Sequence, residues 1–293
     1  MWRELRHDRP EVLLARYREF EWTPLLMARL LRCRLVLEVH SPFAIEEVLR
    51  GGHASRITAW MDRKMFRTAD LIWVHTPELE VLVRDVAPEA VIQLAPFGIE
   101  DRGLLAHPGA TDPPTEIVFV GSFYNWHGVE DLVEAFALAR RQVPELRLSL
   151  VGDGITRPQA EERAHRLGLS HAVEFPGWLD QDEMYARLLR AHIGVAPYRD
   201  SKYNYFEPVK IRDYQMVGLP IVATAVGHIP EMVADGNSGL LIPAGDVEAM
   251  AAALVDLATD PGLRREMGRA SRVSAHAIEE TAEAVVEMCR SVA

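Results

Sequence analysis

Short apolar runs alternate with amphipathic stretches through the second part of the chain. The runs read IVFVG, LRLSLVG, AVEFPG, IGVAP and IVATAV, the first of them starting at Ile117. Between them, apolar residues recur at helical spacing, which predicts helices at about 129–142, 157–167, 181–190 and 208–217. A regular alternation of strand and helix is typical of a parallel sheet with helices on both faces. The sequence therefore predicts an α/β domain in this part.

The first third of the chain shows similar patterns with less regularity. They predict a polar helix at the start, an apolar run at Val12–Ala15, helices at about 23–32 and 57–69, and strands in LIWVHT and VIQLAPFGIE. A further strand, LVLEVH at Leu35–His40, ends in polar residues before a turn. Because α/β proteins place functional groups at such strand ends, His40 is a candidate site residue. A histidine that merely caps a turn is the alternative.

The segment AHPGATDPPT, residues 106–115, separates the two parts. Its prolines and glycine, without any periodicity, predict a linker. We therefore expect a first domain at 1–105, a second domain at 116–260 and a long helical stretch at 261–293.

The stretch FEPVKIRDYQMVGLPIVATAVGHIPE, residues 206–231, carries the strongest functional signal. Pro208 and Gly218 predict the start and the end of a helix. Lys210 lies in its first turn, and Asp213 lies three residues later on a neighbouring part of the same face. A lysine and two helix N-termini then converge on one sheet edge, where open α/β sheets bind anionic ligands. The alternative is an ordinary solvated helix of any α/β protein.

Composition narrows the class of protein. A formal net charge of -11 argues against a general nucleic-acid binder. Cys33 and Cys289 are far apart and lack metal-ligand spacing, so neither a disulfide framework nor a zinc site is predicted. The start, MWRELRHDRP, lacks an apolar signal core, and no uncharged run is long enough to span a bilayer. We expect a cytoplasmic protein.

The ordered motifs resemble those of family 4 of the retaining glycosyltransferases. In that family an acidic residue lies five positions before a Gly-x-Pro, and a Gly-Gly-x-x-Glu loop follows the next strand. The corresponding positions here are held by Asp213, Gly218, Pro220, Gly227, His228 and Glu231. The order VGSF, VGDG, FPGWL and VAPY resembles the donor-binding domain of these enzymes. The resemblance implies a GT-B fold, in which two Rossmann-like domains face a cleft and the last helix returns towards the first domain.

The resemblance also implies roles for individual residues. The implied catalytic positions are His40, which would line the cleft, Glu207 and Lys210. The implied donor-binding positions are Gly121, Ser122, His127, Gly152, Gly177, Leu179, Asp213, Gly227 and His228. Lys210 would face the diphosphate, Asp213 would accept hydrogen bonds from the ribose hydroxyls, and backbone N–H groups would stabilise the remaining charge. No metal is expected, and no cofactor beyond the nucleoside diphosphate sugar that serves as donor substrate.

The sequence departs from the family pattern in four respects. The usual phosphate clamp reads Gly121-Ser122…His127-Gly128, so that a serine and a histidine replace two cations. Asp213 is shorter than the usual glutamate. The family's first glutamate falls on Tyr205, with Glu207 two positions late, where capping of the next helix is an alternative role. The first domain looks incomplete by about 80 to 100 residues relative to two full halves.

We therefore expect a metal-independent retaining glycosyltransferase of carbohydrate biosynthesis. It would transfer a sugar from a UDP- or GDP-sugar, or a related donor, to a sugar, lipid-linked or small-molecule acceptor. A non-catalytic relative that binds nucleotide sugar or a partner glycosyltransferase is the alternative, and a sugar-nucleotide epimerase is a weaker one. The basic amphipathic helix at about 57–69 either packs on its sheet or contacts an anionic membrane as a peripheral protein does.

Overall fold

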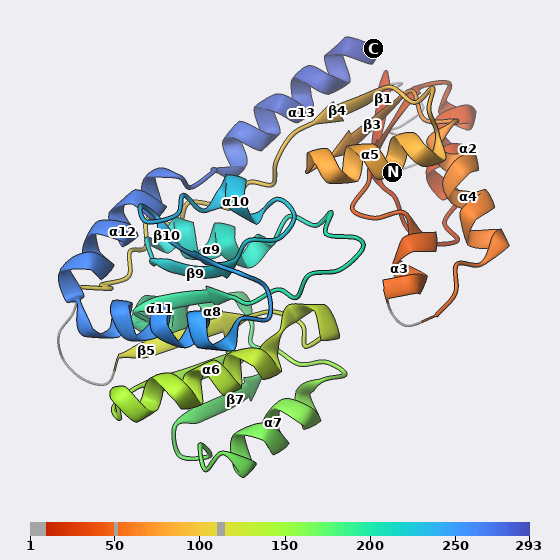
Figure 1. Cartoon of the computed structure of the whole chain (residues 1–293). Coiled ribbons are helices and arrows are strands. Elements are labelled where there is room, and N and C mark those ends of the chain that lie inside the picture. The colour runs from red at the N-terminus through yellow and green to blue at the C-terminus, as the bar shows by residue number, and fades with distance from the viewer. Residues whose placement is uncertain (1–9, 50–51, 110–114) are drawn as a thin grey trace. The chain divides into compact units, whose positions relative to one another are not determined.

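The structure is a computed structural model of the whole chain, and it describes residues 10–49, 52–109 and 115–293 (Figure 1). The chain forms two compact units. The first takes in the described residues of Met1–Gly98 with Tyr203–Glu207 and Ile278–Ala293, and the second those of Ile99–Lys202 with Pro208–Ala277. The chain thus changes unit before the proline-rich segment at 106–115, part of which lies outside the described residues. The domain limits expected from the sequence stay predictions.

The first unit contains a parallel sheet in the order β1-β2-β3-β4. Its strands are β1 (Val12–Arg16), β2 (Arg34–Glu38), β3 (Leu71–Val74) and β4 (Ile92–Leu94), and its helices are α2 (Thr23–Leu31), α3 (Phe43–Leu49), α4 (Arg56–Phe66), α5 (Pro77–Val86) and α13 (Ile278–Val292). Successive residues of β2 point to opposite faces. Leu35 and Leu37 join one apolar cluster, whereas Val36 joins a second cluster with Met288 of α13. The sheet is therefore buried on both faces, as parallel sheets usually are.

The second unit contains a six-stranded parallel sheet in the order β10-β9-β8-β5-β6-β7. The strands are β5 (Glu116–Val120), β6 (Arg147–Val151), β7 (Val173–Gly177), β8 (Ile193–Ala196), β9 (Ile221–Thr224) and β10 (Gly239–Ile242). The helices are α6 (Val129–Gln142), α7 (Arg157–Arg166), α8 (Gln181–Arg190), α9 (Val209–Val217), α10 (Ile229–Met232), α11 (Val247–Thr259) and α12 (Pro261–Val273), with a 3₁₀ turn at Asn125–His127. Helix α6 packs against α11, and α12 packs against α9. The parallel α/β sheet predicted for this part of the chain is confirmed.

Local capping explains why several helix limits follow the sequence prediction. The Asp180 side chain accepts from Glu183 N and the Glu183 side chain accepts from Asp180 N, which starts α8 at Gln181. Gly218 ends α9 in the left-handed conformation, with φ of 74°. Helices α6 and α8 have the predicted limits, and α9 begins one residue later than predicted.

One predicted element differs from the structure, and another lies outside the described residues. The long C-terminal helical stretch is two helices, because the chain is extended or bent between Ser274 and Ala277, where Ala277 forms a β-bridge with Ile99. The polar helix predicted at the start falls on residues 1–9, outside the described residues. Among the residues that the structure describes, no helix is both long and apolar enough to cross a membrane.

Candidate functional site

Three glycine turns meet at the carboxyl edge of the second sheet. Gly121 follows β5, Gly152 follows β6, and Gly177 ends β7. Gly121 N donates to Val151 O over 3.0 Å, and Gly152 N donates to Gly177 O over 2.8 Å. Gly152 has φ of 127°, and a Cβ there would lie 1.9 Å from Gly121 O. Three of the four predicted donor-site glycines therefore lie together, in a packing that tolerates no side chain at residue 152.

Lys210 is buried directly beneath Gly121. A Cβ at residue 121 would meet Lys210 Cε at 3.0 Å and Nζ at 3.1 Å, so that the glycine leaves the space that the lysine occupies. Lys210 Nζ donates to Tyr198 Oη over 2.7 Å and lies 4.9 Å from the centre of the Phe119 ring. Burial lowers the pKa of Lys210 to about 7, although the charge of Asp213 opposes this. Such a perturbed cation beside a glycine turn is a candidate phosphate ligand.

Asp213 is buried as well, so that the alternative of a solvated helix face is wrong for this residue. Its Oδ1 accepts a hydrogen bond from Tyr185 Oη of α8 over 3.0 Å. Burial raises the pKa of Asp213 to about 6, although the Tyr185 hydrogen bond and the Lys210 charge lower it. Lys210 and Asp213 are therefore both held in surroundings that disfavour their charged forms, as is frequent in functional sites.

His127 is held by the turn that precedes α6. Its Nδ1–H donates to the carbonyl oxygen of Ser122, and its ring contacts the Tyr198 ring edge-on at 5.0 Å between centroids. Burial, and next the positive charge of Lys210, lower the pKa of His127 to about 2. The surroundings thus oppose a protonated ring at this position, where the family has a cation, and the positive charge of this edge comes from Lys210.

The remaining donor-site positions lie on neighbouring loops of the same unit. Gly227 follows β9 with φ of 50°, and His228 is the N-cap residue of the short α10. His228 Nδ1 lies 3.7 Å from Glu231 Oε2. Leu179 is half-buried after β7, next to the exposed Trp178. Nothing in the geometry tests the roles of these residues, which stay predictions.

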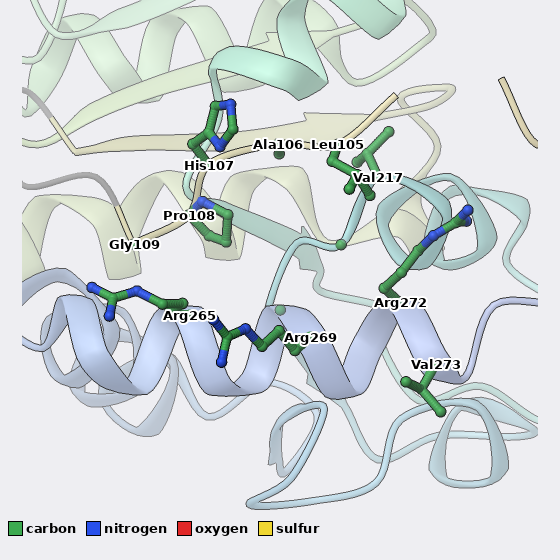
Figure 2. A pocket seen from close by; sticks show the side chains of 12 residues that line it. Leu105, Ala106, His107, Pro108, Gly109, Val217, Arg265, Arg269, Arg272 and Val273 are labelled. Atoms are coloured by element: carbon green, nitrogen blue, oxygen red, sulfur yellow. The ribbon is translucent and has the colours of Figure 1, made fainter. Parts of the chain in front are cut away.

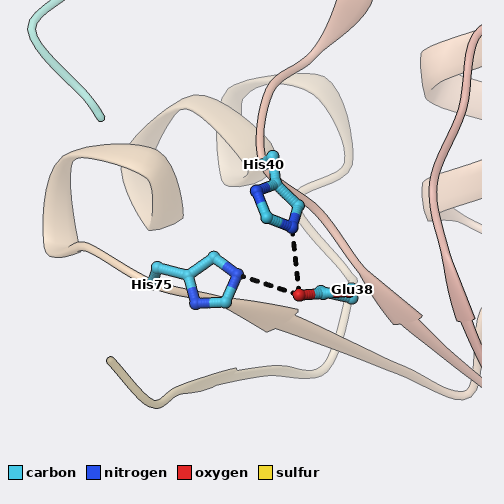
Figure 3. Close-up of side chains that lie close together, drawn as sticks. All are labelled: Glu38, His40 and His75. Carbon is cyan, nitrogen blue, oxygen red and sulfur yellow. Dashed lines mark hydrogen bonds and ion pairs between the residues drawn. The ribbon is translucent and has the colours of Figure 1, made fainter. Parts of the chain in front are cut away.

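In the first unit, His40 belongs to a cluster with Glu38 and His75 (Figure 3). His40 Nε2 lies 3.0 Å and His75 Nε2 3.5 Å from Glu38 Oε1. Arg16 Nε donates to Glu38 Oε2 over 3.0 Å. Burial raises the pKa of Glu38, but the hydrogen bonds from His40 and Arg16, together with the nearby His75 ring, outweigh this effect and hold the pKa well below its usual value. Burial lowers the pKa of His75.

Glu207 joins this cluster through Phe97. Its Oε2 accepts a hydrogen bond from Phe97 N over 2.9 Å. The Phe97 ring stacks on His75 with 3.8 Å between centroids and lies 4.9 Å from His40. The alternative of a cap on the next helix is wrong for Glu207, since Pro208 is the N-cap residue of α9. The fold therefore brings two of the three predicted catalytic residues, His40 and Glu207, into one neighbourhood.

Sequence reasoning missed the residues that support these groups. Tyr198 and Tyr185 contact Lys210 and Asp213, while His75 contacts Glu38. A signal existed for two of them, because Tyr198 and His75 each follow a buried strand closely, as His40 does. Tyr185 lies inside a helix, where nothing local marks it.

A separate cavity of about 580 Å³ lies at the carboxyl end of α9, remote from Lys210 in the first turn (Figure 2). Val217 and Gly218 line it together with Leu105–Gly109 and α12, whose Arg265 and Arg269 border it. Val217 lies seven positions after Lys210 in the helix, which corresponds to about 10 Å along the axis. The cavity is therefore distinct from the edge that holds Lys210.

Comparison with known proteins agrees with this geometry. Residues 114–260 match the family described as glycosyl transferases group 1, and the chain belongs to this family. The glycogen synthase of Mycobacterium tuberculosis (strain CDC 1551 / Oshkosh) is 31% identical over 159 residues, which are 54% of this chain and 37% of that protein. The chain spans between 34% and 43% of the length of five such curated relatives.

Solved structures show the same fold over nearly the whole chain. The sucrose-phosphate synthase of Thermosynechococcus elongatus superposes with a TM-score of 0.78 and 22% identity, covering 99% of this chain and 76% of the other. Anabaena Alr3699/HepE, solved in complex with UDP and glucose, gives a TM-score of 0.78 and 15% identity over 99% of this chain and 81% of the other. The fold is thus of the GT-B type, with parallel, Rossmann-like sheets, as the sequence predicted.

Proposed function

We propose that the protein is a retaining glycosyltransferase of the family 4 type, which transfers a sugar from a nucleoside diphosphate sugar without a metal ion. The observation that carries the proposal is the buried Lys210 beneath Gly121, three residues before the buried Asp213. A lysine at a glycine turn offsets the charge that develops on a departing diphosphate. Membership of the glycosyl transferases group 1 supports the same chemistry.

Each site residue then has a defined task. Lys210 contacts the diphosphate, together with backbone N–H groups near Gly121, Ser122 and Gly227, while the neutral His127 borders it. Asp213 accepts from the ribose hydroxyls. The nucleoside lies against Gly152, Gly177 and Leu179, and the donor sugar against His228. His40 and Glu207 act on the acceptor side. There the acceptor hydroxyl attacks the anomeric carbon on the face from which the diphosphate leaves, the bond between this carbon and the diphosphate breaks, and the hydroxyl proton passes to a diphosphate oxygen.

A calorimetric screen of UDP-, GDP-, ADP- and TDP-sugars tests the proposal, with release of the nucleoside diphosphate as the measure of turnover. We expect one of these donors to bind, and to bind equally well in EDTA, because no metal takes part in holding the diphosphate. Binding of none of them would contradict the proposal, and so would a strict requirement for Mg²⁺ or Mn²⁺. Binding without turnover on any acceptor would favour the alternative of a non-catalytic relative. Interconversion of two donors would favour the alternative of an epimerase.

The Asp213→Asn variant should weaken donor binding. It keeps an oxygen that accepts from Tyr185 Oη but loses the charge that the ribose hydroxyls would contact. Loss of a charge-assisted hydrogen bond costs about 1.5 to 3 kcal/mol of binding free energy. Calorimetry with the donor identified in the screen measures the effect, and an unchanged Kd would remove the ribose role from Asp213. The exposed Asp182, changed to Asn, is the control and should bind normally.

The affinity for UDP-glucose should pass through a maximum between about pH 6 and pH 7. The pKa of Asp213 is raised to about 6, so that affinity falls below this pH as the carboxylate becomes protonated. The pKa of Lys210 is lowered to about 7, so that above this pH the free protein must take up a proton on binding, and affinity falls by up to about tenfold per pH unit. UDP-glucose suits the titration because its doubly esterified diphosphate has no proton to lose in this range.

Variants assign the two limbs of this profile. The Asp213→Asn variant should remove the fall in affinity at acidic pH. The Lys210→Met variant should remove the fall in affinity at alkaline pH. His127→Ala should leave both limbs in place, because the ring is already neutral over this range. A profile that is flat from about pH 5 to pH 9 would show that neither buried group meets the donor.

We also propose that α4 gives the first unit a peripheral contact with anionic membranes. Ile57 and Trp60 are 63% and 58% exposed on this helix, next to the exposed Arg56, Arg63 and Lys64. Sedimentation with vesicles of anionic and of zwitterionic lipid tests the contact. We expect binding to the anionic vesicles that is lost in an Ile57→Ser/Trp60→Ser double variant and kept in Leu167→Ser, which changes an exposed leucine of the second unit. Equal sedimentation of the wild type and the double variant would refute the contact.

A further inference from the structure

Glu38, His40 and His75 come together because two parallel strands end at the same edge of the first sheet. Glu38 is the last residue of β2, and His40 follows two residues later. His75 directly follows β3, whose Trp73 pairs with Glu38. Their three ligand atoms, namely Glu38 Oε1 and the Nε2 atoms of the two histidines, lie within 4.8 Å of one another. The cluster thus rests on sheet register and not on a mobile loop.

The hydrogen bond of His75 Nδ1 determines which of the two ring nitrogens carries the proton. Nδ1 lies 3.1 Å from the carbonyl oxygen of Ala95, which can only accept, so that Nδ1 carries the proton. His75 is 4% exposed, and its Nε2 has no hydrogen-bond partner among the described residues. In the neutral ring this nitrogen presents a lone pair towards the Glu38 carboxylate 3.5 Å away. Glu38 Oε1 already has His40 Nε2 and Arg16 Nη2 beside it, so that the buried His75 Nε2 is the atom left without a partner, and a cation between it and Glu38 would satisfy it.

The spacing and the surroundings of the three atoms suit a metal ion. A tetrahedral zinc site with bonds of about 2.0 to 2.1 Å has ligands about 3.3 Å apart. The distances from Glu38 Oε1 to the two histidines are 3.0 Å and 3.5 Å. A metal-binding histidine typically donates its other N–H to a backbone carbonyl, as His75 does to Ala95. Arg16 donates to both carboxylate oxygens, from Nε to Oε2 over 3.0 Å and from Nη2 to Oε1 over 3.3 Å. These contacts fix the plane of the Glu38 carboxylate, while the positive charge of Arg16 moderates the affinity for a further cation.

We propose that Glu38, His40 and His75 bind one divalent transition-metal ion of the zinc type. The ligand atoms are Glu38 Oε1, His40 Nε2 and His75 Nε2. Among the described residues no fourth histidine, cysteine or carboxylate joins the group, so that one position remains for water or another small oxygen ligand. This site belongs to the first unit and includes His40, the residue proposed to act on the acceptor side. The metal independence proposed above concerns the donor diphosphate, which is assigned to the second unit.

The test is direct binding of zinc to the full chain. Calorimetric titration with ZnCl₂, and metal analysis after dialysis, should give one zinc per chain with a micromolar Kd. Titration with Co²⁺ should give visible absorption of a nitrogen and oxygen site without thiolate charge-transfer bands, which excludes Cys33 and Cys289 as ligands. Absence of stoichiometric zinc binding would overturn the proposal, and so would thiolate bands.

Variants locate the ion. His40→Ala should weaken zinc binding at least about tenfold. The His40 side chain is 35% exposed, so that its loss is compatible with folding. His75→Phe, which keeps a ring against Phe97, should have the same effect, and circular dichroism checks its fold. His165→Ala removes an exposed histidine of the second unit as the matched control and should bind zinc as the wild type does. Unchanged zinc affinity in the folded His40 and His75 variants would place the ion elsewhere and overturn the proposal.

Discussion

Replacing Lys210 by methionine is expected to weaken binding of the nucleotide-sugar donor about 10- to 150-fold and, at the same time, to stabilise the fold. The loss of affinity corresponds to one charge-assisted contact with the diphosphate, about 1.5 to 3 kcal/mol. The gain in stability follows from burial, which lowers the pKa of Lys210 to about 7 and so makes its ammonium group costly to keep. Methionine has a similar shape and no charge, and we expect a gain on the order of 2 kcal/mol near neutral pH.

The size of the stability effect changes with pH in a way that identifies its cause. Between about pH 7 and the ordinary lysine value of 10.5, the unfolded wild type binds more protons than the folded protein, so that its stability rises with pH. That rise should be absent from the Lys210→Met variant. Urea midpoints at several pH values measure the stability effect, and calorimetry with the donor identified in the screen measures the effect on binding. Lys64 is an exposed lysine of the first unit, and the Lys64→Met variant should change neither the stability nor the donor affinity. A variant that is less stable and binds normally would show that Lys210 is a packing residue.

The Gly152→Ala variant is expected to lose at least about 4 kcal/mol of stability, the largest effect of any substitution considered. The new Cβ would lie 1.9 Å from Gly121 O and 2.9 Å from Gly121 C, both backbone atoms of the neighbouring turn. The backbone angle φ of 127° adds strain, because side chains rarely adopt it. Either the two turns separate or the fold weakens, and donor binding should be lost in both cases because Lys210 lies beneath the displaced Gly121.

Gly168 provides the matched control for this steric argument. It also has a positive φ, of 71°, but a Cβ there would meet nothing within 4 Å. Gly168→Ala should therefore cost only the backbone strain, about 1 to 2 kcal/mol. Urea midpoints of the two variants give the comparison. Equal losses would mean that backbone strain, and not the contact with Gly121, dominates at Gly152.

The local patterns located the elements of the second unit well because their signals act over a few residues. Gly218 ends α9, and Asp180 with Glu183 starts α8, so that these limits follow from neighbouring residues in the chain. The prediction of one long C-terminal helical stretch was wrong for the same reason, because it too rested on local patterns. Its apolar periodicity continues from α12 to α13, while the break at Ser274–Ala277 coincides with a bridge to the distant Ile99.

The sequence by itself determined the fold class, the family resemblance and the candidate positions of Lys210 and Asp213 on one helix face. The tertiary structure decided their chemical state, because Tyr198 and Tyr185 come from other elements and bury them. His127 follows the same rule: its identity in the motif favoured a cation, but desolvation and the nearby Lys210 keep it neutral. Ionisation depends on burial and on charges brought close by strand register, and these distances are set by residues far apart in the chain.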